Sequence, residues 1–358
     1  MHQKLLFLLL VIMPSFLYAQ SYNKLHFKSI VVDTHNDLLS KAVDDNLTID
    51  TDLSGKTHSD IDRFKKGGVD VQLFSVWCDG LKENPYAWAN REMDTLDAVI
   101  KRNPEKISLS GTPSLLKKAV KEKKIAAMFG VEGGHMIENK LDNLNNFYNR
   151  GVRYMTLTWN NSTDWASSAW DETINADKLK QKGLTDFGKQ VIRRMNELGM
   201  IIRNLKDEQI KAIGKNGGVI HLNFYSGFID SSYDRRSDIF NSRHKAELDS
   251  LLKINPEPYF ANEYLFKKYP EEVKSLRPPL SMLIDHLDYI VKMIGVDHVG
   301  IGSDFDGINS APQQLDDVTN LPLFTKELMN RGYSKKDIRK ILGENFLRVF
   351  KANKPENK

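Results

Sequence analysis

The chain has 358 residues, which is enough for one large domain or two small ones. Hydrophobic residues make up 41% and charged residues 27%, the proportions of an ordinary soluble globular protein. The 51 basic and 47 acidic residues leave a net charge of only +4 without a dense basic stripe, which argues against nucleic-acid binding. The single cysteine, Cys78, excludes an intrachain disulfide and a cysteine-built metal site.

Residues 1–19 have the pattern of a signal peptide. Lys4 supplies the positive charge, residues 5–17 form the apolar stretch, and Ala19 precedes a plausible cleavage site. The apolar stretch is too short to span a membrane comfortably, and no second stretch is long enough. We therefore expect an exported protein, periplasmic or secreted, that begins near residue 20 and has no membrane span.

After residue 20, short apolar strands alternate with amphipathic helices. Strands are predicted at 30–34, 69–77, 125–131, 152–158, 200–202, 219–224 and 298–302. Helices are predicted at 61–66, 86–102, 144–148, 184–198, 207–213 and 283–294, with two more within 322–352. Repeated β-α units imply a parallel α/β sheet, and a TIM-like barrel formed by a single domain, 20–358, is the expected closure.

A long connection near 226–279 does not fit the repeat. It is rich in charged and aromatic residues, including Tyr259, Phe260 and Tyr264. Because it follows the C-terminal end of a strand, it is expected either to cover the site as a helical lid or to pack at the periphery.

Polar side chains stand where three of the predicted strands end. His35 and Asp37 follow the first strand, Glu132 follows the third, and Asp304 follows the last. Active sites of barrels lie at the C-terminal ends of the strands, and a catalytic zinc commonly takes three protein ligands and a water. These four residues therefore predict one metal site, although Glu132 or Asp304 alone is also compatible with a helix cap or a salt bridge.

Five motifs occur in order, at 32–38, 68–72, 130–135, 151–158 and 297–307. Over nearly the whole mature chain they resemble the renal or membrane dipeptidase family, zinc peptidases of the amidohydrolase superfamily. The resemblance implies a TIM-like barrel of the metal-dependent hydrolase type. It also implies a two-zinc site that cleaves dipeptides, including those with a D-residue at the C-terminal position.

By this resemblance, His35 and Asp37 are ligands of the first metal, and Glu132 bridges both metals. Asp304 touches the metal site and handles the proton, so Glu132 and Asp304 are the predicted catalytic residues. Arg203 matches an arginine that contacts the substrate carboxylate.

The chain departs from the family after Ile202. In the family, two successive strands end in histidines that bind the second zinc, whereas here residues 199–202 run straight into Arg203. One β-α unit and both histidines are therefore missing, and none of the nine histidines is an obvious substitute; His221 is expected to be a hydrogen-bonded core residue. We expect one zinc ion rather than two.

The substrate pocket also differs. Trp159 stands where many members carry a substrate-contacting histidine, and we expect Trp159 and Asn223 to line the pocket with Arg203. Three functions fit: an exported zinc dipeptidase that acts through metal-activated water, a catalytically impaired member that binds a ligand or partner, and a single-metal amidohydrolase acting on another amide or a lactone. The four retained ligands favour the dipeptidase. Its expected partner is a dipeptide, and a homodimer is compatible with the sequence.

Overall fold

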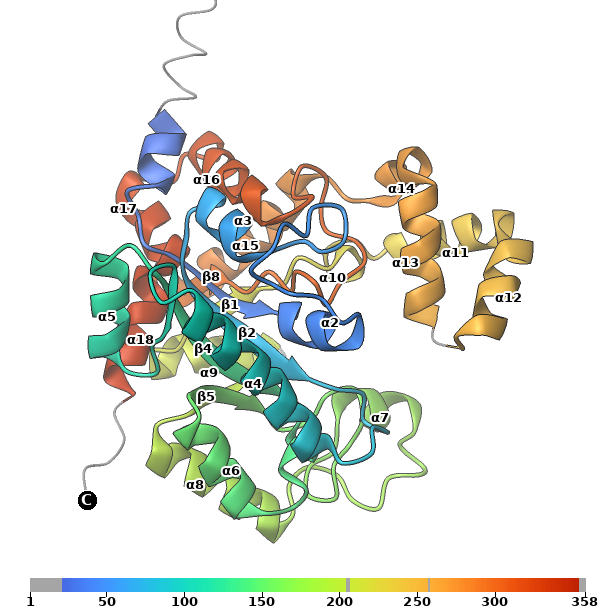
Figure 1. Ribbon diagram of the computed structural model, residues 1–358, viewed down its shortest axis with the longest axis horizontal. Helices are drawn as coiled ribbons and strands as arrows, with labels where there is room; N and C mark the ends of the chain where they lie inside the picture. Colours follow the sequence, from blue (N-terminus) through green and yellow to red (C-terminus); the bar gives the residue numbers. More distant parts are fainter. Residues whose placement is uncertain (1–20, 204–206, 257, 354–358) are drawn as a thin grey trace, which may run out of the picture.

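The computed structural model describes residues 21–203, 207–256 and 258–353, so the predicted signal peptide lies outside this part. A sheet of eight parallel strands lies at the centre of the molecule, with helices around it (Figure 1). The strands are β1 (Val31–Asn36), β2 (Val69–Trp77), β3 (Ile107–Leu109), β4 (Ile125–Glu132), β5 (Val152–Thr156), β6 (Ile201–Arg203), β7 (Ile220–Leu222) and β8 (Val299–Ile301).

Seven of these strands are ordered β6-β5-β4-β2-β1-β8-β7, and β3 pairs with β4. All the ladders are parallel, which confirms the predicted α/β class, and the order agrees with a TIM-like barrel. Within the described residues no ladder joins β6 to β7, so the sheet is open there. The missing β-α unit predicted after Ile202 falls at the same point of the strand order.

Most predicted helices are present with bounds shifted by a few residues, whereas α2, α5, α7 and β3 were not predicted. The helices outside the insertion are α2 (Leu38–Asp44), α3 (Ile61–Lys66), α4 (Pro85–Arg102), α5 (Pro113–Lys121), α6 (Leu141–Asn149), α7 (Ala169–Ile174), α8 (Asp186–Leu198), α9 (Asp207–Asn216), α15 (Leu280–Ile294), α16 (Leu321–Asn330), α17 (Lys335–Arg339) and α18 (Asn345–Ala352). Short 3-10 turns cover Gly134–Ile137, Val296–His298 and Val318–Asn320, and a π-helical turn, Lys340–Glu344, joins α17 to α18.

Local signals explain where several helices begin and end. Asp60 caps α3 by accepting the backbone N–H of Arg63 at 2.8 Å, and the Thr112 hydroxyl caps α5. Helix α8 ends at Gly199, whose φ of +70° lies in the left-handed region that glycine adopts without steric strain.

Strands β1, β2 and β4 are almost entirely buried on both faces, as expected for a parallel sheet. Phe74 and Phe129 belong to the large cluster that packs the sheet against the helices. Their neighbours Leu73 and Met128 point the other way, into a second cluster that includes Phe346 of α18. The apolar runs of the sequence therefore supply two cores, one on each side of the sheet.

The connection at 226–279 is helical. It contains α10 (Ser226–Ile229), α11 (Tyr233–Arg243), α12 (Lys245–Ile254), α13 (Pro258–Lys268) and α14 (Pro270–Leu276). Helices α11 to α14 lie together at one side of the molecule (Figure 1) and share a small core of their own, which includes Phe240, Leu265 and Val273. The Lys41 ammonium, on α2, lies 2.8 Å from the Glu263 carboxylate and joins this group to the strand-end region.

Candidate metal centre

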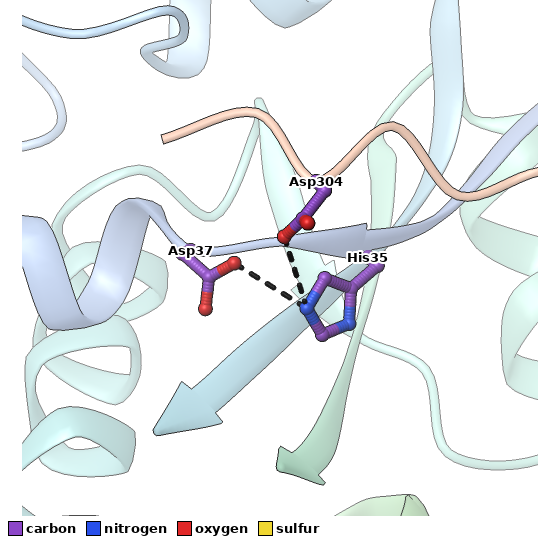
Figure 2. A group of neighbouring side chains, drawn as sticks. All are labelled: His35, Asp37 and Asp304. Atoms are coloured by element: carbon purple, nitrogen blue, oxygen red, sulfur yellow. Dashed lines mark ion pairs between the residues drawn. The ribbon is translucent and has the colours of Figure 1, made fainter. Parts of the chain in front are cut away.

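Three of the four predicted ligands meet at the C-terminal ends of β1 and β8. His35 lies on β1, Asp37 follows it, and Asp304 follows β8 (Figure 2). His35 Nε2 is 3.3 Å from Asp37 Oδ2 and 3.4 Å from Asp304 Oδ1, and the three ligand atoms lie within 4.8 Å of one another. One imidazole nitrogen and two carboxylate oxygens converging in this way form a donor set for a divalent metal ion.

The fourth predicted ligand, Glu132, borders this cluster. It is the last residue of β4, and its Oε2 lies 3.0 Å from His35 Nε2. The side chain of Glu132 is 25% exposed, whereas that of His35 is only 2% exposed. Glu132 therefore lies between the buried cluster and the cavity that opens above it.

The Asp37 side chain fits a bound cation. Asp37 directly precedes α2, but its carboxylate does not cap that helix. Both carboxylate oxygens are buried, and the imidazole of His35, with Nε2 3.3 Å from Oδ2, is their ion-pair partner when it is protonated. An imidazole that ligates a metal is neutral, and a cation held between Asp37, His35 and Asp304 would then compensate the buried carboxylate.

The loop after β8 is shaped around the same carboxylates. A Cβ atom at Gly307 would lie 2.3 Å from Asp37 Oδ2 and 2.8 Å from Asp304 Oδ1, so no larger residue fits there without displacement. Asp304 and Asp306 have φ values of +64° and +69°, a conformation that non-glycine residues rarely adopt. Such backbone strain is concentrated at functional sites.

Hydrogen bonds on the far side of each ligand fix its orientation. The Tyr154 hydroxyl lies 2.5 Å from His35 Nδ1, which leaves Nε2 directed toward the carboxylates. The Tyr154 ring passes over β4 at Gly130, where a Cβ atom would lie 2.0 Å from the ring. Asn223 Nδ2 donates to Asp304 Oδ2 at 2.6 Å. Partners of this kind set the tautomer and orientation of metal ligands.

The charges of the cluster are strongly coupled. Burial raises the pKa of Asp304 well above its usual value, and the negative charges of Asp37 and Glu132 add to that effect. Burial also disfavours ionised Asp37, but the adjacent His35 outweighs it and lowers the Asp37 pKa. Burial opposes a charged imidazole, yet Tyr154, Glu132 and Asp37 together hold the pKa of His35 well above its ordinary value.

A cavity of about 750 Å³ opens onto Asp37, Glu132 and Asp304. Trp77 and Trp159 form one part of its wall, with ring centroids 5.1 Å apart in an edge-to-face arrangement. Helix α13 also contributes to the wall, through Tyr259, Phe260 and Glu263. Helix α13 therefore borders the cavity, as a helical lid formed by residues 226–279 would.

The remaining candidates have different surroundings. The backbone of Arg203 ends β6 beside Thr156 of β5, but the Arg203 side chain lies outside the described part of the structure. Asn223 contacts the Asp304 carboxylate. His221 Nδ1 lies 3.1 Å from the carbonyl oxygen of Ile301, as expected for a core histidine.

Sequence reasoning missed three contributors to this site. Tyr154 and Gly307 lie inside quoted motifs, but the sequence alone gave no reason to single them out. Strand alternation could have found Tyr154, since it shares a strand face with Thr156 beside β4. Trp77 could have been found as the last residue of its strand.

A parallel α/β sheet with an imidazole-carboxylate cluster at the strand ends is the arrangement of a TIM-like protein with a candidate metal centre at its C-terminal face. The family model for membrane dipeptidases (peptidase family M19) matches residues 19–202 and 203–358. The chain therefore belongs to the membrane dipeptidase family. The two matched segments meet at the junction where the sequence predicts the missing β-α unit.

Solved structures share this fold. A probable dipeptidase from Pseudomonas aeruginosa, PvdM, is 22% identical, with a TM-score of 0.74 over 94% of this chain and 98% of its own. The metallopeptidase dipeptidase AC is 20% identical, with a TM-score of 0.71 over 91% of this chain and 99% of its own. A Rhodobacter sphaeroides metallopeptidase, liganded with a phosphinate mimic of the dipeptide L-Ala-D-Ala, is 19% identical. Its TM-score is 0.69 over 90% of this chain and 99% of its own.

Proposed function

We propose that this protein is a zinc-dependent dipeptidase in which His35, Asp37, Glu132 and Asp304 hold one zinc ion. The observation that carries the proposal is the buried cluster of His35, Asp37 and Asp304, whose ligand atoms converge within 4.8 Å, in a chain of the membrane dipeptidase family. Zinc accepts imidazole and carboxylate ligands. The two histidines that bind a second zinc in the family are missing from the sequence, so we propose one ion per chain.

A zinc ion in such a site would lower the pKa of a bound water to about 7 and would polarise the substrate carbonyl. Asp304 accepts the proton of the attacking water and passes it to the leaving amine. Asn223 donates a hydrogen bond to Asp304 Oδ2 and so keeps Asp304 Oδ1 directed toward His35. Tyr154 fixes the imidazole of His35. By the family resemblance we assign Arg203, whose side chain lies outside the described part of the structure, to the substrate carboxylate. A planar guanidinium binds a carboxylate through two hydrogen bonds, which favours short peptides.

The test is hydrolysis of a panel of L,L and L,D dipeptides by the purified, zinc-loaded chain. We compare the wild type with Asp37→Ala and with Asp186→Ala, whose side chain is 92% exposed on α8. Cleavage that requires metal, is lost in Asp37→Ala and is retained in Asp186→Ala is the expected result. Metal analysis is expected to give about one zinc per chain, because the four proposed ligands are enough for one catalytic zinc, which commonly takes three protein ligands and a water. Two tightly bound zinc ions would contradict the single-metal proposal.

A second candidate function is favoured by the opening between β6 and β7 and by the missing histidine pair. In it, the chain keeps the fold and binds a ligand or partner without turnover, or uses a single metal on another amide or a lactone. A folded, zinc-loaded protein that cleaves no dipeptide would favour this group of functions, and a panel of amides and lactones would separate its two members.

Export and assembly complete the proposal. We propose cleavage after residue 19 and a periplasmic or secreted mature protein, which mass spectrometry of the N-terminus tests. Among the described residues, no helix has both the length and the apolar character needed to cross a bilayer. A homodimer is also proposed, and light scattering of the purified protein tests it.

A further inference from the structure

Two indole side chains stand beside Glu132. Trp77 ends β2 and is the ladder partner of Glu132 on β4, so the two side chains leave the sheet next to each other. Trp159 follows β5 and packs its ring against that of Trp77 at 5.1 Å. Both rings line the cavity, and both residues keep part of their surface exposed to it. We define these two side chains as the indole wall.

The indole wall is held in place from behind. Glu92 of α4 is completely buried, and its carboxylate accepts the backbone N–H of Trp77 at 2.9 Å. The other oxygen of Glu92 accepts the indole N–H of Trp88 at 3.0 Å, and Trp88 lines the same cavity. Glu92 thus fixes the backbone of Trp77 and the indole of Trp88, while the rings of Trp77 and Trp159 pack against each other. These contacts reduce the side-chain ordering that remains for the binding step.

The charge of the cavity adds a second restriction. Asp44, Asp45 and Asp79 stand in its lining in addition to the carboxylates of the metal centre, and among the described lining residues the cations are Lys41 and Lys82. Lys41 is already paired with Glu263 and Asp45, and Lys82 lies 3.5 Å over the Trp88 ring. A further carboxylate on a substrate side chain would meet repulsion here.

We propose that the indole wall is the subsite for an aromatic side chain of the substrate, so that the preferred substrates are dipeptides with an aromatic residue and no acidic one. This inference rests on the proposed dipeptidase function. It follows from the position of the wall, since a peptide bond placed at the metal centre brings a flanking side chain against Trp77 and Trp159. A large aromatic side chain buries far more apolar surface on such a wall than a methyl group does.

The test is a comparison of kcat/KM for Ala-Ala, Phe-Ala, Ala-Phe and Ala-Glu with the zinc-loaded full chain. We expect at least one phenylalanine dipeptide to exceed Ala-Ala by on the order of tenfold or more, the selectivity available to an apolar pocket, and Ala-Glu to fall below Ala-Ala. Trp159→Ala removes most of the preference, Trp159→Phe retains it, and Trp170→Ala, at an exposed tryptophan on α7, leaves it unchanged.

Each result has one meaning. Cleavage of Ala-Ala at the same rate as both phenylalanine dipeptides by the wild type overturns the inference and leaves the proposed function standing. A preference that survives in folded Trp159→Ala also overturns it. Failure to cleave any of the four dipeptides overturns the proposed function and this inference with it. Circular dichroism and thermal melting show whether each variant is folded.

Discussion

Removing the Tyr154 hydroxyl should weaken metal binding without removing a ligand. In Tyr154→Phe the ring that passes over Gly130 remains, but His35 Nδ1 loses the hydroxyl that lies 2.5 Å away. His35 is only 2% exposed, so water does not readily replace that partner. Loss of such an outer partner lowers metal affinity by roughly 10–100-fold, which corresponds to about 1.4–2.7 kcal/mol.

The assay is competition for zinc between the metal-free protein and a chelator at constant pH, with thermal melting of the metal-free protein alongside. Tyr148→Phe is the matched control, since the Tyr148 ring packs on the Arg153 guanidinium at 4.3 Å rather than on the cluster. We expect a weaker zinc affinity in Tyr154→Phe alone. An affinity equal to that of the wild type, in a folded variant, would refute the role given to this hydroxyl.

Three further predictions concern single residues. Gly307→Ala should lower zinc affinity in the chelator assay more than Tyr154→Phe does, because its Cβ would lie 2.3 Å from Asp37 Oδ2; unchanged affinity would contradict the steric reading. Burial lowers the pKa of His26 from 6.5 to about 4, so the unfolded chain takes up this proton first as the pH falls. Urea unfolding should therefore show up to about 3 kcal/mol of stability lost between pH 6.5 and 4, and less in His26→Gln. Burial raises the pKa of Cys78 to about 12, so iodoacetamide at pH 8 should label it only after unfolding, and rapid labelling of folded protein would argue otherwise.

Much of the fold could be predicted from local sequence patterns. All seven predicted strands are present, because each contains an apolar run bounded by polar or glycine residues. The strand that was missed, β3, covers Ile107–Leu109, where a central serine interrupts the apolar run. The short helices α2, α5 and α7 were also missed. Helix α3 is equally short, but the glycines that follow it marked its end.

The sequence by itself determined which polar residues stand at strand ends, because an apolar run that turns polar is a local feature. It placed His35, Asp37, Glu132 and Asp304 there, whereas the missing β-α unit was inferred from the resemblance to the dipeptidase family. Only the tertiary structure decided which atoms face one another. Tyr154 reaches His35 across 119 residues of sequence, and α13 reaches the cavity from an insertion whose packing had two interpretations. Such contacts depend on strand order, on the curvature of the sheet and on the space left by a residue such as Gly130, and these are properties of the whole assembly of elements rather than of any one segment.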